Sequence, residues 1–98
     1  MIQIIALLYA GINGVEGLRA FESQVIPILR EYNGTLISAS YNANEPAGEP
    51  DEIHVIQFPS VESFEAYKND DRIVNLSALK AKMIRKMDIY ITTAFLQY

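Results

Sequence analysis

The stretch Ile2-Gln3-Ile4-Ile5-Ala6-Leu7-Leu8-Tyr9 reads as a β-strand that is apolar on both of its faces. Side chains of a strand alternate between the two faces of a sheet, so a sheet with one face in water should alternate apolar and polar residues. In this stretch one face carries the residues at 4, 6 and 8, and the other carries those at 5, 7 and 9. Both faces are apolar except for the hydroxyl of Tyr9. We therefore expect the chain's own helices to cover one face, and a second chain or a ligand to cover the other.

The rest of the chain reads as helix, strand, strand, helix and strand. Apolar residues at helical spacing follow Asn13, which can cap a helix, and end at Asn33-Gly34, where Gly34 is expected to supply the left-handed cap. Strands are predicted at 35–42 and 52–58, with one long loop over 43–51 between them. A short helix is predicted after Ser60, a further helix from Asp70 to residue 87, and a last strand at 88–96.

This order of elements predicts the fold class. Right-handed crossovers place both helical layers on the same side of one sheet. We therefore predict an α+β, ferredoxin-like βαββαβ domain over residues 1–98, with a four-stranded antiparallel sheet. The strands at 2–9 and 52–58 are expected at its centre, because they are the most apolar on both faces.

Composition excludes several classes of function. The chain has 98 residues and a net charge of −4, and that acidic balance is atypical of proteins that bind nucleic acid. It contains no cysteine and a single histidine, His54, so thiolate chemistry, iron–sulfur clusters and His-rich metal sites within one chain are not expected. The apolar start has no basic region and is too short to span a bilayer, so neither a membrane segment nor a signal is expected. We expect a cytoplasmic protein with no cofactor and no metal.

Two further stretches resemble a known family. Residues 55–67, Val-Ile-Gln-Phe-Pro-Ser-Val-Glu-Ser-Phe-Glu-Ala-Tyr, are similar to the signature of an uncharacterised family in which Glu-Phe-Pro-Ser leads from a strand into a helix bearing an aromatic residue. Val25-Ile26-Pro27 and Tyr32-Asn33-Gly34 resemble that family's Val-x-Pro and Tyr-Gly-Gly. The family belongs to the dimeric α/β-barrel superfamily of ferredoxin-like domains, whose members include cofactor-free monooxygenases of the antibiotic-biosynthesis type.

The resemblance implies a homodimer in which two sheets pack face to face as a barrel. It also shows one departure from the family pattern, because the glutamate before Phe-Pro-Ser is Gln57 in this chain. A glutamine cannot act as a general base at neutral pH.

Several polar side chains are candidates for a ligand site. Gln57 shares its strand face with Ile53 and Val55 and is expected to face the cavity between the two sheets, where a buried amide needs a partner. Tyr9 and Tyr41 each end an apolar face near a loop, where a tyrosine suits the mouth of a pocket, although packing at the rim explains them as well.

The other two candidates are a histidine and an arginine. His54 shares its strand face with Phe58 and is expected to lie toward the helices, either as a structural histidine or as a titrating group. Arg72 follows Asp70 and Asp71 in a polar cluster in which helix capping explains both aspartates.

Two functions remain open from the sequence. The first is a dimeric protein that binds a small molecule, either between sheet and helices or in the cavity between the sheets. The alternative is a cofactor-free monooxygenase-like or isomerase-like enzyme acting on a small organic substrate. The small number of titratable groups favours the binding protein.

Overall fold

The computed structural model describes residues 1–44 and 47–98, so two residues of the predicted loop over 43–51 lie outside the described part. Its elements follow the predicted order. They are β1 (Ile2–Ala10), α1 (Gly14–Glu31), β2 (Thr35–Tyr41), β3 (Glu52–Phe58), α2 (Val61–Lys68), α3 (Asp71–Asn75), α4 (Ser77–Met83) and β4 (Ile84–Thr92).

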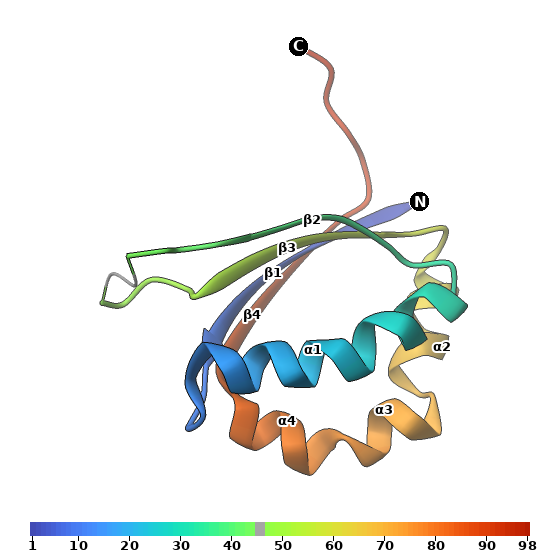
Figure 1. Cartoon of the computed structure of the whole chain (residues 1–98). Helices are drawn as coiled ribbons and strands as arrows, with labels where there is room; N and C mark the ends of the chain where they lie inside the picture. The colour runs from blue at the N-terminus through green and yellow to red at the C-terminus, as the bar shows by residue number, and fades with distance from the viewer. Residues whose placement is uncertain (45–46) are drawn as a thin grey trace.

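The four strands form one antiparallel sheet in the order β2-β3-β1-β4. The fold is therefore ferredoxin-like, and the prediction that the first and third strands are central is confirmed. The helices all lie on one side of the sheet (Figure 1). The opposite face is not covered by any element among the described residues.

The two faces of the sheet differ in burial, and the side chains of β1 alternate between them. Its residues Ile2, Ile4, Ala6 and Leu8 are buried and pack against side chains of the helices in two apolar clusters. Residues of the other face are only half-buried at the centre of the sheet; they include Ile5 and Leu7 of β1 and Ile53 and Val55 of β3. The covered face is the core, and the open face is an apolar surface.

The helix predicted to run to residue 87 is shorter in the structure. It is divided into α3 and α4, and β4 begins at Ile84 instead of residue 88. The reason is pairing with β1: Ile84 lies opposite Ala10, and the next residues continue along β1 toward its start. Backbone hydrogen bonds from Gly11 and Ile12 to the last carbonyls of α4 hold this switch from helix to strand. Thus tertiary pairing overrides a helical pattern that the local sequence allows.

The helix caps differ in part from the predictions. Asn13 precedes α1, but its side chain makes no capping hydrogen bond. The Ser60 side chain accepts a hydrogen bond from the Ser63 backbone N–H, as expected for a cap. At the end of α1, however, Asn33 and not Gly34 adopts the left-handed conformation, with φ of 63°. Gly34 is needed for space, because a Cβ there would lie 2.7 Å from the Leu29 side chain and 2.8 Å from that of Phe58.

The chain continues for six residues after β4. The predicted strand to residue 96 ends at Thr92, and the following segment leaves the sheet on the side away from the helices (Figure 1). This tail carries Phe95, Leu96 and Tyr98, all of which are exposed.

Candidate functional site

Three ionisable side chains meet in the layer between α1 and the sheet. Glu22 comes from the middle of α1, whereas Glu52 and His54 come from β3. The exposed fractions of these residues are 8%, 6% and 6% respectively. Polar groups buried to this degree are uncommon in a chain of this size and need a reason.

Strand alternation and small neighbours explain why the imidazole fits there. Glu52 and His54 are two positions apart, so both point to the helix-covered face. His54 lies opposite Ala6 on β1 and opposite Ala39 on β2. These small side chains leave room for the imidazole and for Glu22 above it.

The cluster is held by short polar contacts. His54 Nε2 lies 2.9 Å from Glu52 Oε1 and 3.2 Å from Glu22 Oε2. Arg19 Nε lies 3.3 Å from the second oxygen of Glu52. Because an ionised Glu52 can only accept hydrogen bonds, His54 Nε2 must carry the hydrogen that it donates to Glu52.

The environment shifts all three pKa values. Burial, together with the nearby Glu52, raises the pKa of Glu22. Burial also opposes the charge on Glu52, but the adjoining Glu22 and the hydrogen bonds from His54 and Arg19 outweigh burial and lower the pKa of Glu52. For His54, burial disfavours the imidazolium, but the nearby carboxyl groups of both glutamates outweigh burial and raise the pKa of His54. The cluster therefore favours a charged His54–Glu52 pair beside a Glu22 that resists ionisation.

This cluster forms the floor of a groove of about 340 Å³ between α1 and the edge strand β2. Arg19 and Tyr41 form its rim, with the guanidinium 5.2 Å from the centre of the tyrosine ring. Ile26 of α1 and the β2 residues Ala39 and Ser40 complete the lining. The volume lies at the lower end of the range for small-molecule sites.

The five sequence candidates are not brought together. Only His54 and Tyr41 lie at the groove. Tyr9 shares the strand face of Ile5 and Leu7, but it is buried, because it packs under the cations of Lys86 and Arg85. Gln57 is also on the open face, half-buried, and its amide donates to Gln3 Oε1 over 3.4 Å.

Two predictions about faces can now be compared with this placement. His54 lies toward the helices, as its shared face with Phe58 predicted. Tyr41 lies opposite Glu52, on the covered side, whereas Tyr9 and Gln57 point to the open side. A single cavity in this chain therefore cannot be lined by all three of Tyr9, Tyr41 and Gln57. That Gln57 faces a cavity between two sheets stays a prediction.

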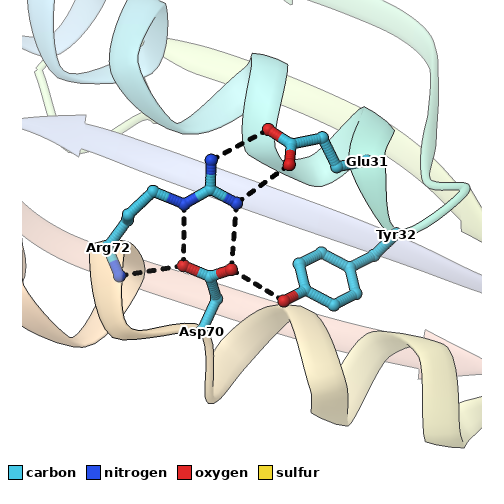
Figure 2. Close-up of polar contacts among 4 residues, drawn as sticks. All are labelled: Glu31, Tyr32, Asp70 and Arg72. Carbon is cyan, nitrogen blue, oxygen red and sulfur yellow. Dashed lines mark hydrogen bonds and ion pairs between the residues drawn. The ribbon is translucent and has the colours of Figure 1, made fainter.

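Arg72 is committed to a structural network (Figure 2). Its guanidinium donates to both oxygens of Glu31 and both oxygens of Asp70, each over 3.0 Å. The Tyr32 hydroxyl donates to Asp70 as well, over 2.7 Å. Hydrogen bonds from Arg72 and Tyr32 hold the pKa of Asp70 well below its usual range. These contacts fasten the end of α1 to the start of α3 and occupy most of the donors a ligand would need.

The sequence reasoning missed Glu22, Glu52 and Arg19. The sequence did indicate that Glu52 lies near His54, because the two residues are two positions apart and share a strand face. Glu22 lies four residues after the buried Leu18 and directly follows Phe21, so its position on α1 already pointed toward the core. No local pattern connects α1 with β3, because the contact spans about thirty residues of chain.

Comparison with known proteins identifies the family of this ferredoxin-like chain. Residues 4–95 match the model of a domain of unknown function, DUF1330, so the chain belongs to that family. No curated protein matches the chain. Among the described residues, no helix has both the length and the apolar character needed to cross a membrane.

Solved structures support the same fold. A protein of unknown function from Rhodopseudomonas palustris superposes with a TM-score of 0.77 at 14% identity, covering 98% of this chain and 83% of that one. An antibiotic biosynthesis monooxygenase superposes with a TM-score of 0.72 at 10% identity, covering 98% and 100%. A dimeric ferredoxin-like protein of unknown function from Thermobifida fusca has a TM-score of 0.59 at 18% identity, covering 95% and 90%. At these identities the similarity establishes the fold alone.

Proposed function

We propose that this chain is a homodimeric protein that binds a small organic molecule in the groove between α1 and β2. The observation that carries the proposal is the buried group of Glu22, Glu52 and His54 at the floor of a groove of about 340 Å³. Buried charges are costly to a small domain, and perturbed ionisable groups in a concave site are typical of binding and catalytic sites.

The lining indicates the kind of ligand. The floor presents carboxyl oxygens of Glu22 and Glu52, which favour a ligand with hydroxyl or amino donors. The exposed ring of Tyr41 and the side chain of Ile26 offer apolar contact at the side. A compact polar metabolite with one apolar face fits this arrangement.

A ligand screen tests the proposal. Thermal melting or NMR with a panel of polar metabolites should find compounds that Arg19→Gln or Tyr41→Ala weakens. Arg30→Gln is the matched control, because Arg30 is exposed on the same helix and does not line the groove. Binding that Arg30→Gln weakens as much as Arg19→Gln would contradict the proposal. Conversion of a bound compound into product would instead assign the enzyme that the sequence left as the alternative.

The homodimer is supported by the open face of the sheet. That face is apolar at its centre, where Ile5 and Leu7 of β1 lie opposite Val55 and Ile53 of β3. Exposed apolar side chains continue into the tail after Thr92. A stable interface buries about 800 Å² per partner, which a four-stranded sheet face can supply. The dimeric structure from Thermobifida fusca shows that a protein with this fold can form dimers.

Oligomeric state is directly measurable. Light scattering should give a dimer for the natural chain and a monomer for Leu7→Glu, which places a charge at the centre of the open face. Ala66→Glu, on an exposed position of α2, is the control and should remain a dimer. A natural chain that is monomeric at micromolar concentration would refute the dimer.

A further inference from the structure

We infer that Glu22, Glu52 and His54 form a binding site for one divalent first-row transition-metal ion. The inference goes beyond the small-molecule site proposed above, because the metal would bind at the groove floor whether or not an organic ligand is present. It also departs from the sequence-based expectation of no metal. That expectation rested on the scarcity of histidine and cysteine, and carboxylate donors were left out of the count.

The spacing of the three donors suits a metal ion. One potential ligand atom from each residue lies within 4.8 Å of the other two. His54 Nε2 is 2.9 Å from Glu52 Oε1 and 3.2 Å from Glu22 Oε2. Ligand atoms about 2.1 Å from a shared ion are about 3.0–3.4 Å apart in octahedral or tetrahedral geometry. The side chains therefore need little movement to accept an ion.

An unpartnered oxygen provides a second, independent indication. A ring N–H has one hydrogen, and the one on His54 Nε2 is donated to Glu52. Glu22 Oε2 is buried and has no hydrogen-bond partner among the described residues, although it points at the same imidazole. A buried acceptor without a partner is unfavourable. A cation bound between the three side chains would contact Glu22 Oε2. It would also reduce the repulsion between the carboxylates of Glu22 and Glu52.

The charges around the cluster leave room for a cation. Metal binding at His54 Nε2 would displace the hydrogen that this nitrogen carries and would favour the ionised form of Glu22. Among the described residues that line the groove, Arg19 would then be the one remaining cation; it contacts Glu52 and is half-exposed. A dication would balance the carboxylates of Glu22 and Glu52 in place of the displaced protons.

The donor set indicates which ions to expect. One imidazole nitrogen with two carboxylate oxygens suits Zn²⁺, Mn²⁺, Fe²⁺ or Co²⁺, whereas Mg²⁺ and Ca²⁺ favour oxygen ligands throughout. Because all three residues line the groove, the coordination positions they do not fill would face it. These positions would be open to water or to an oxygen-bearing ligand.

The test uses the whole chain, stripped with a chelator and then titrated with Zn²⁺, Mn²⁺ and, as a comparison, Mg²⁺. Calorimetry should show one site per chain for Zn²⁺ and Mn²⁺ and much weaker binding of Mg²⁺. At a hundredfold excess over Kd the melting temperature should rise by roughly 10–20 °C. His54 is the only histidine, so a change in the single set of imidazole NMR signals on adding Zn²⁺ can be assigned to this residue.

Matched variants make the test specific. Glu22→Gln and His54→Gln should each weaken Zn²⁺ binding at least tenfold, whereas Glu62→Gln, at an exposed position of α2, should leave it unchanged. If one of the site variants does not fold, the other carries the comparison. Absence of Zn²⁺ and Mn²⁺ binding by the natural chain, or equal binding by Glu22→Gln, would overturn the metal site. Neither result bears on the proposed binding of an organic molecule, which is tested separately with Arg19→Gln.

Discussion

Replacing Glu22 by glutamine should stabilise the metal-free protein. The substitution keeps the shape of the side chain but removes a buried carboxyl group whose Oε2 has no hydrogen-bond partner among the described residues. The new amide can donate to the carboxylate of Glu52, which adjoins it in the cluster. Most substitutions of buried residues destabilise a protein, so a gain would be informative.

The expected size follows from the environment of Glu22. A buried polar atom left without a partner costs about 1–3 kcal/mol. Recovering part of this should raise the free energy of unfolding by about 1–2 kcal/mol. For a domain of this length each kcal/mol corresponds to about 4–8 °C in melting temperature.

The gain should depend on pH with a definite sign. The pKa of Glu22 is raised in the folded protein, so its contribution to stability is present below its ordinary value of 4.5 and is lost as pH rises through the folded value. Glutamine does not titrate. The stability of Glu22→Gln relative to the natural chain should therefore be smallest at and below pH 4.5 and grow as pH rises through the folded pKa of Glu22. His54 acts in the same direction: Glu22 helps to raise its pKa, and the resulting stabilisation of the natural chain is present below pH 6.5 and is lost as pH rises through the folded pKa of His54.

Urea denaturation at about pH 5 and about pH 8, in the presence of a chelator, measures this difference. Glu62→Gln, on the exposed side of α2, controls for the loss of one negative charge. Two results would contradict the expected stabilisation: Glu22→Gln destabilises the chain at about pH 8, or its free energy of unfolding differs from that of the natural chain by the same amount at both pH values. Either result would show that the Glu22 carboxyl group has adequate hydrogen-bond partners in the folded protein. The reasoning about the buried cluster would then be refuted.

Two further predictions concern the frame around the site. Gly34→Ala should destabilise the protein by about 1–3 kcal/mol in urea denaturation, because its Cβ would meet Leu29 and Phe58 at less than 3 Å; an unchanged midpoint would show that these side chains can move aside. Arg72→Gln should raise the pKa of Asp70 toward its ordinary value in an NMR titration and leave binding in the groove unchanged. Loss of ligand binding by this variant would instead make Arg72 part of the site.

The architecture of the sheet was predictable because it depends on a strong local signal. A strand that is apolar on both faces belongs at the centre of a sheet, and β1 lies there. The same alternation placed His54 on the covered side, because Phe58 on the same strand face had to lie beneath a helix. The placement of His54 on the covered side, which rests on side-chain parity within one regular strand, was confirmed.

Parity fails where a strand is irregular. The register of β2 against β3 shifts between Leu36 and Ser38, so Ile37 is an extra residue and the alternation changes there. Tyr41 consequently lies opposite Glu52 on the covered side, and not in a cavity with Tyr9 and Gln57. A bulge of this kind has no reliable sequence signal in a short polar strand.

The start of β4 could not be predicted for a different reason. Residues 80–87 carry apolar side chains at a spacing compatible with a helix, and only pairing with β1 decides that the strand begins at Ile84. The site itself shares this dependence on tertiary contacts. Glu22 meets His54 because α1 packs over β3, and neither segment alone indicates that they touch.

The alternation of β3 also connects the two proposals made for this chain. His54 faces the groove, whereas its neighbours Ile53 and Val55 face the open side, where a second copy would pack. A partner pressed against Ile53 and Val55 would hold the backbone of β3 and thereby the position of the imidazole, without adding a side chain to the groove. We therefore expect the monomeric Leu7→Glu chain to retain the groove but bind its ligand more weakly than the dimer, because its site is less preorganised. Equal affinity in calorimetry would show that the two faces of the sheet act independently.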